Sequence, residues 1–148
     1  MFEWGLLALL ILALVLLFLH KAQQVQGQAE LATIKTTLGA LRTAAIMDDL
    51  QAKARGRAGA TQVNPFELLQ VRPVNYQGAL SPLQATGVRE GSWWFDLDRG
   101  CVTYAPLEPR WLTGHSGGAV LRFRVIAGGG PLQLEALEPY LWQGMRVD

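Results

Sequence analysis

The motif DxDxG, formed by Asp96, Asp98 and Gly100, is the arrangement in this sequence that most resembles a metal-binding loop. Calcium loops begin with carboxylates at alternate positions and use a glycine for the sharp turn. An EF-hand also needs a bidentate acid further on, and none follows at that spacing. Because the same residues fit the turn of a β-hairpin, we favour a structural role. We expect no cofactor, and calcium at Asp96 and Asp98 is the alternative.

A histidine and a serine lie side by side in TGHSGG, and the single cysteine, Cys101, adds a further nucleophile. A nucleophile elbow places its serine between a strand and a helix. His115 and Ser116 instead lie in a glycine-rich connection before a strand, so we expect no catalytic residues and a protein that is not an enzyme. Cys101 fits a small apolar strand residue.

The tryptophans and the net charge indicate which kinds of partner this protein could bind. The five tryptophans include Trp4, which fits an interfacial anchor, and Trp93, which fits a core position. Trp94 points to the opposite face of the same strand, which makes it a candidate partner contact. The formal net charge of +1 gives no basic field for nucleic acid.

The elements that must position these residues start with an apolar N-terminus. The segment from Phe2 to Leu19 comes close to the 20 or so residues that span a bilayer. A cleaved signal peptide would need a basic start and a nearby small-x-small site, whereas Glu3 is acidic and the nearest such site, at Gly27, lies too far on. We expect an uncleaved membrane anchor.

Helix-forming residues continue beyond the apolar segment to Ala54. An apolar stripe with spacings of three and four runs along this part, which indicates a helix that packs on a partner. Its members are Leu31, Ile34, Leu38, Leu41 and Ala45. The sequence ARGRAGATQ then ends the helix near Arg55. We expect a transmembrane half over 1–21, an extramembrane half over 22–55 and a head domain over 56–148.

The head shows the alternating period of β-strands. Asn64 and Pro65 predict a short helical turn through Leu69. The segments SWWFDL and CVTY predict a hairpin whose loop, 98–100, uses Gly100 at positive φ, with Leu97 on the inward face. The segments around 121–125 and 132–136 predict two further strands. The predicted fold is α+β: a long N-terminal membrane-spanning helix packed on an antiparallel sheet of about four strands.

This order of parts resembles type IV pilins and the pseudopilins of type II secretion, in particular a minor, pilin-like group. The similar segments are NPFELL with PVNY, GSWWFDLDRGCVTY, and LRFRV. The resemblance implies an inner-membrane, single-pass protein with a periplasmic C-terminal domain that forms homo- or hetero-oligomers with pilin-like subunits or other assembly proteins. Some pseudopilins bind calcium through loops.

The resemblance also implies roles for particular residues. Glu3 would pair with a neighbouring subunit's terminal amine, and the span would pack through Leu6, Leu10 and Ala13. Independently of the resemblance, the apolar stripe predicts that the head docks on Leu31, Ile34, Leu38 and Leu41. Pilins carry a short basic leader ending in glycine, which is not recognisable before Glu3. Either the chain starts differently or it keeps Met1, and the alternative function is a scaffold or binding module that is anchored in the membrane and does not polymerise.

Overall fold

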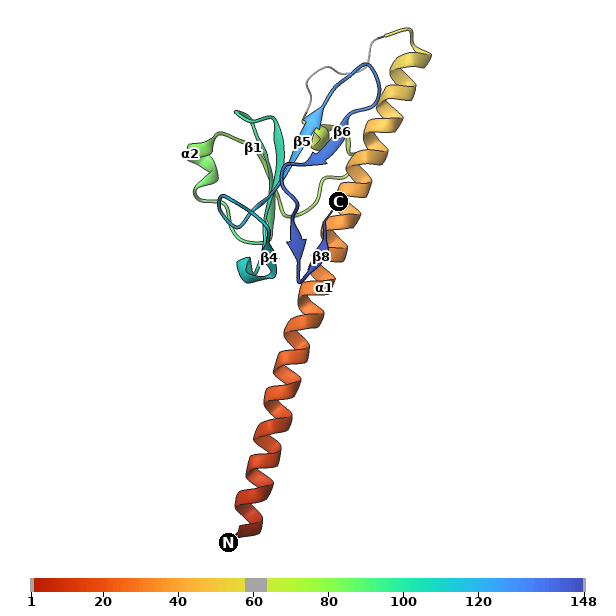
Figure 1. The fold of residues 1–148 in the computed structure, drawn as a ribbon. Coiled ribbons are helices and arrows are strands. Elements are labelled where there is room, and N and C mark those ends of the chain that lie inside the picture. Colours follow the sequence, from red (N-terminus) through yellow and green to blue (C-terminus); the bar gives the residue numbers. More distant parts are fainter. Residues whose placement is uncertain (1, 58–63, 148) are drawn as a thin grey trace. The chain divides into compact units, whose positions relative to one another are not determined.

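The computed structural model describes residues 2–57 and 64–147. By its internal contacts the chain divides into two compact units, with the boundary between Thr33 and Ile34. We call the second of them the head unit. The helix α1, Phe2–Ala54, contributes to both units (Figure 1). Its 53 residues include no proline, so no backbone donor is lost along its length.

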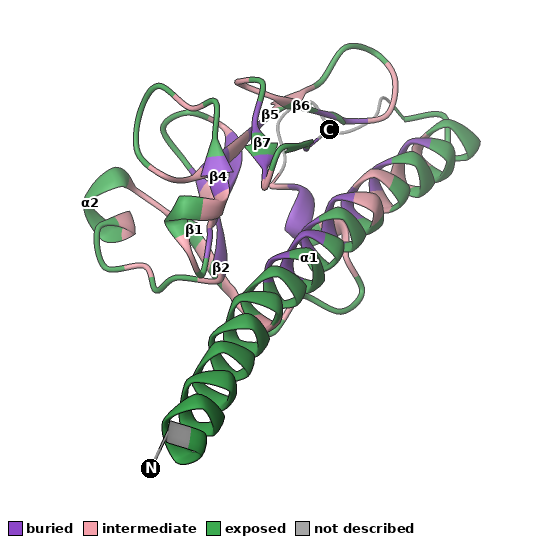
Figure 2. Cartoon of the chain, turned by 60° about the horizontal axis from the view of Figure 1, so that its bottom comes forward, coloured by how far each residue is buried: buried purple, intermediate pink, exposed green. Residues whose placement is uncertain are grey.

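The second half of α1 is part of the core of the head unit. Ile34, Leu38 and Leu41 are fully buried and Ala45 is nearly so. Figure 2 shows the buried positions of this part of the helix as a purple stripe along one side. Because residues three and four apart share a helix face, the predicted stripe is the face that packs on the sheet.

The main sheet has five strands in the order β1-β2-β3-β5-β6. The strands are β1 (Tyr76–Leu80), β2 (Ser92–Asp96), β3 (Cys101–Ala105), β5 (Leu121–Ile126) and β6 (Gln133–Ala136). The four predicted strands form the antiparallel part, from β2 to β6. The fifth, β1, pairs with β2 in parallel, so the sheet is mixed and larger than predicted. The α+β fold is confirmed with this correction.

Short elements complete the head unit. They are the helical turns η1 (Pro65–Leu68), α2 (Pro82–Ala85) and η2 (Pro109–Trp111), and a second sheet of β4 (Leu112–Thr113), β7 (Leu141–Trp142) and β8 (Met145–Arg146). The predicted turn after Asn64 is η1, because the Asn64 side chain accepts a hydrogen bond from the Phe66 amide. The second sheet was not predicted, since two-residue strands carry no readable alternation.

The apolar face of the main sheet is continuous across its strands. Trp93, Tyr104 and Leu121 lie opposite one another in adjacent strands, and all three are buried. Phe66 of η1 stacks on Tyr76 at 4.1 Å between ring centroids, and it lies 6.1 Å from Trp93. The motif NPFELL therefore anchors η1 on the core.

Candidate functional site

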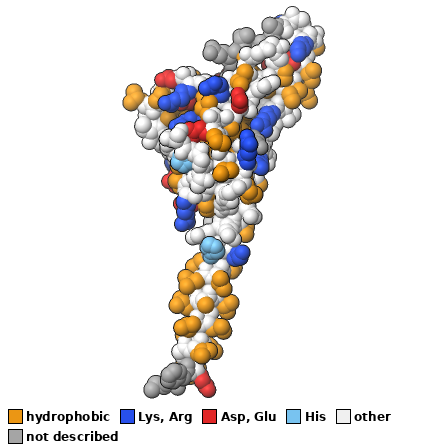
Figure 3. Space-filling view, viewed as in Figure 1, with side chains coloured by type: hydrophobic (Ala, Val, Ile, Leu, Met, Phe, Trp, Pro, Cys, Tyr) orange, Lys and Arg blue, Asp and Glu red, His pale blue; other side chains and the backbone are white. Residues whose placement is uncertain are grey.

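The apolar part of α1 presents its side chains outward. All residues from Glu3 to Lys21 are exposed, and Figure 3 shows apolar side chains along the visible side of this segment. This helix is long and apolar enough to cross a membrane. His20 and Lys21 follow the apolar run, where polar side chains reach the interface.

Glu3 lies in the first turn of α1 beside the proposed packing residues. Glu3 lines a shallow, largely apolar surface groove together with Leu6, Leu7 and Leu10. Leu6 is 72% exposed and Leu10 is 57% exposed, and Ala13 is exposed as well. These residues are free to contact lipid or another helix, as the subunit-pairing and helix-packing hypotheses require.

The predicted docking residues are all buried. Ile34, Leu38 and Leu41 belong to the head unit and have no exposed surface, and Leu31 is 5% exposed. Burying each of these side chains contributes about 1.5–3 kcal/mol relative to exposing it. The second half of α1 is therefore a structural part of the head unit.

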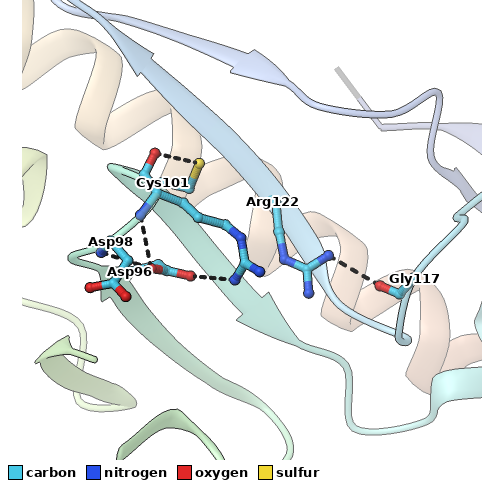
Figure 4. A network of polar contacts seen from close by, with 6 residues as sticks. Asp96, Asp98, Cys101, Gly117 and Arg122 are labelled. Atoms are coloured by element: carbon cyan, nitrogen blue, oxygen red, sulfur yellow. Dashed lines mark hydrogen bonds and ion pairs between the residues drawn. The ribbon is translucent and has the colours of Figure 1, made fainter. Parts of the chain in front are cut away.

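The DxDxG motif forms the turn between β2 and β3. Asp96 Oδ1 accepts hydrogen bonds from the backbone amides of Asp98 and Arg99, each at 3.1 Å. The Arg99 guanidinium binds Asp96 Oδ2 at 3.1 Å (Figure 4). Gly100 has a φ of +59°, as predicted. Because both oxygens of Asp96 bind the hairpin's own groups, this residue has a structural role here, and an ion would have to displace those contacts.

Two neighbours of this hairpin differ from the sequence-based expectation. Leu97 follows the last residue of β2 and is 56% exposed, so it is not an inward strand residue. Trp94 is only 7% exposed, because both faces of β2 are covered. Its cross-strand neighbour Thr103 is buried with it. Trp94 therefore offers little exposed surface to a partner in this chain.

Cys101 and the pair His115–Ser116 lie in separate environments. Cys101 is buried, its thiol donates to the Arg99 carbonyl, and burial raises the pKa of this thiol. Ser116 donates to the Glu138 carboxylate through both its hydroxyl and its amide. These hydrogen bonds lower the pKa of Glu138. Ser116 thus ties a glycine-rich loop to the segment after β6, which is a structural task.

A surface that the sequence did not reveal lies along the head part of α1. An open groove of about 620 Å³ runs between this helix and the segment 67–70. Small residues, Ala40 and Ala44, and the exposed Met47 lie on its helix side. The groove forms only because η1 packs beside the helix, so no local sequence pattern predicts it.

No protein family, no curated protein and no solved structure matches this chain. Among the described residues, no group of three or more histidine, cysteine, aspartate or glutamate side chains could hold a metal ion. The chain is thus defined by its architecture, an α+β protein with one candidate membrane-spanning helix.

Proposed function

We propose that this protein is a structural, non-enzymatic subunit or accessory protein of a pilin-like or pseudopilin-like assembly. It sits in the inner membrane through a single span, with its C-terminal domain in the periplasm. Its span packs laterally against the helices of other subunits or of inner-membrane assembly proteins.

The single observation that supports this proposal is that α1 combines an exposed apolar segment with a part of the head core. One helix of 53 residues carries an exposed apolar segment in its first part and a fully buried stripe in its second part. A simple tether needs no such continuity, because a flexible linker would attach a domain to a membrane equally well. A helix shared by span and core transmits packing in the membrane to the head.

Crosslinking within the span tests the proposal. The full-length chain, with Cys101→Ala, receives Leu10→Cys on the Glu3 face or Val15→Cys on the opposite face, about 140° around the helix. In membranes of cells that supply the native partner proteins, we expect Leu10→Cys to form at least threefold more disulfide-linked species. The two sites are both exposed and apolar, which matches them for thiol environment. They lie within about two helical turns of each other, so their depths in the membrane are similar.

A chain that stays monomeric at both positions would contradict lateral packing between copies of this chain, because a disulfide forms only with a second cysteine. That result would favour the non-polymerising scaffold or binding module instead. Equal crosslinking at both positions would show association without a defined face and would contradict the role given to Leu6, Leu10 and Ala13.

A further inference from the structure

The strand β1 forms an edge of the main sheet, and it pairs with β2 alone among the described residues. The Leu80 carbonyl accepts a hydrogen bond from the Leu97 amide, so the backbone of Leu80 faces β2. The backbone groups of the preceding residue, Ala79, therefore point to the open side. Gln77 and Ala79 are both exposed. We call this side of β1 the open edge.

The residues around the open edge carry no charge. Between Arg72 and Arg89 the sequence has no acidic residue, no basic residue and no histidine. Edge strands in soluble proteins are commonly protected by charged side chains that keep other strands away. The two ends of β1 instead carry apolar side chains, of which Val74 is fully exposed and Leu83 is 87% exposed. The open edge therefore lacks the charges that would exclude another strand.

The opposite edge of the sheet, β6, is different in both respects. It carries the exposed residue Glu135. The Arg42 side chain of α1 donates a hydrogen bond to the Leu134 carbonyl at 3.5 Å, so a helix side chain already binds the backbone of this strand. Of the two edges of the main sheet, β1 is thus the one that is open to a further strand.

Backbone amides and carbonyls at strand spacing are complementary to the backbone of another extended segment. We propose that the open edge binds a β-strand of a different protein chain, which adds a sixth strand to the five-stranded sheet. The partner segment is uncharged, because a charged side chain here would be desolvated without an opposite charge to offset that cost. The exposed Val74 and Leu83 favour apolar side chains in it. This inference rests on the proposed function, since it takes the partner to be another component of the same assembly.

A second copy of this chain is a poor occupant of the open edge. Two copies of β1 would pair antiparallel, about a two-fold axis perpendicular to the sheet. That rotation also reverses the direction of residues 34–54 of α1, which pack along the face of the sheet. Chains that are anchored in one membrane through the continuous helix α1 must carry it in the same direction. The partner strand therefore comes from a different chain.

Photo-crosslinking from two matched positions tests the inference in the full-length chain with Cys101→Ala. A benzophenone maleimide is attached to Gln77→Cys in β1 or to Gln133→Cys in β6, since both positions are exposed glutamines in edge strands. In membranes of cells that supply the native partner proteins, we expect Gln77→Cys to give at least fivefold more adduct with a different chain. Mass spectrometry should place the link in a partner segment with at least five consecutive uncharged residues.

Three results of this experiment would overturn the inference. They are equal yields from Gln77→Cys and Gln133→Cys, a link in a charged segment of the partner, and an adduct made of two copies of this chain.

Changes at Ala79 separate strand pairing from simple proximity. Ala79→Pro removes the outward amide, and Ala79→Lys keeps the amide but adds a charge to the open edge. Each should lower the adduct yield from Gln77→Cys at least threefold. Ala79→Val keeps both the amide and the neutral edge, so its yield should stay within twofold. Because Ala79 is exposed, the lysine variant keeps the test valid even if proline unfolds β1. An adduct that survives both Ala79→Pro and Ala79→Lys would contradict strand pairing.

The two proposals fail separately. If Leu10→Cys forms disulfide-linked species and Gln77→Cys gives no specific adduct, the strand-binding role of β1 is wrong and the lateral packing of the span stands. If Gln77→Cys gives its adduct and Leu10→Cys stays monomeric, β1 binds a strand and the lateral packing between copies is wrong.

Discussion

At the residue scale, the chemistry that the sequence offers is used for structure. Asp96 offers the ligands of a metal loop, yet it binds the amides and the guanidinium of its own turn. Ser116 offers a hydroxyl nucleophile, yet it binds Glu138. In both places a polar side chain satisfies backbone or side-chain groups that a tight loop would otherwise leave without partners.

The hairpin role of Asp96 makes a direct prediction. Asp96→Ala removes the acceptor of two backbone amides in a residue that is 5% exposed, so the free energy of unfolding should fall by about 1–3 kcal/mol. Asp98→Ala is the matched control, because Asp98 is exposed, and its effect should stay within about 0.5 kcal/mol. Denaturant unfolding in detergent, followed by tryptophan fluorescence, measures both.

Calcium gives the result that would contradict this interpretation. A calcium-dependent rise in the melting temperature of the wild-type chain that Asp98→Ala abolishes would show that the motif is a binding loop.

At the element scale, two different sequence signals predict α1. Apolar composition predicts its first part, and the spacing of apolar residues predicts its second part. The spacing of three and four from Ile34 to Ala45 predicted the buried face, and the structure buries those residues. The strands β2, β3, β5 and β6 were predicted from alternation, and the turn between β2 and β3 from Gly100. The strand β1 was not, because YQGAL alternates weakly and Gly78 adopts a φ of +104°.

Truncation of the stripe tests the element. Leu38→Ala opens a cavity at a fully buried position, and the free energy of unfolding should fall by about 2–5 kcal/mol. Leu50→Ala, three turns further along and 56% exposed, should change it by less than about 0.5 kcal/mol. Equal losses at the two positions would contradict the assignment of the buried face. Chemical denaturation of the full-length chain in detergent provides the comparison.

At the scale of the whole molecule, one helix supplies both a candidate membrane span and part of a folded core. Exposing the leucines of its first part to water is unfavourable, because burying such a side chain is worth about 1.5–3 kcal/mol of free energy relative to exposing it. A bilayer removes that cost. The span is therefore a feature of the sequence that the head unit does not need for its own packing.

Charge placed in the span tests membrane insertion. Leu9→Arg together with Leu12→Arg should cost roughly 5–7 kcal/mol at the bilayer centre, taking about 2.5–3.5 kcal/mol for each arginine. We expect the chain to leave the carbonate-resistant membrane fraction, whereas Leu9→Val with Leu12→Val should remain in it. A doubly arginine-substituted chain that still resists carbonate extraction would contradict a span over these residues.

The sequence by itself determined the local order of this protein: the apolar helix, the stripe, the turn after Asn64 and the hairpin closed by Gly100. Each of these features is predicted by a local repeat of apolar residues or by a residue with a strong backbone preference. The tertiary structure decided what depends on distant partners, namely the parallel pairing of β1, the burial of Trp94 and the groove beside η1. Such features follow from which segments pack together, and a side chain's own position in the sequence does not record what will cover it.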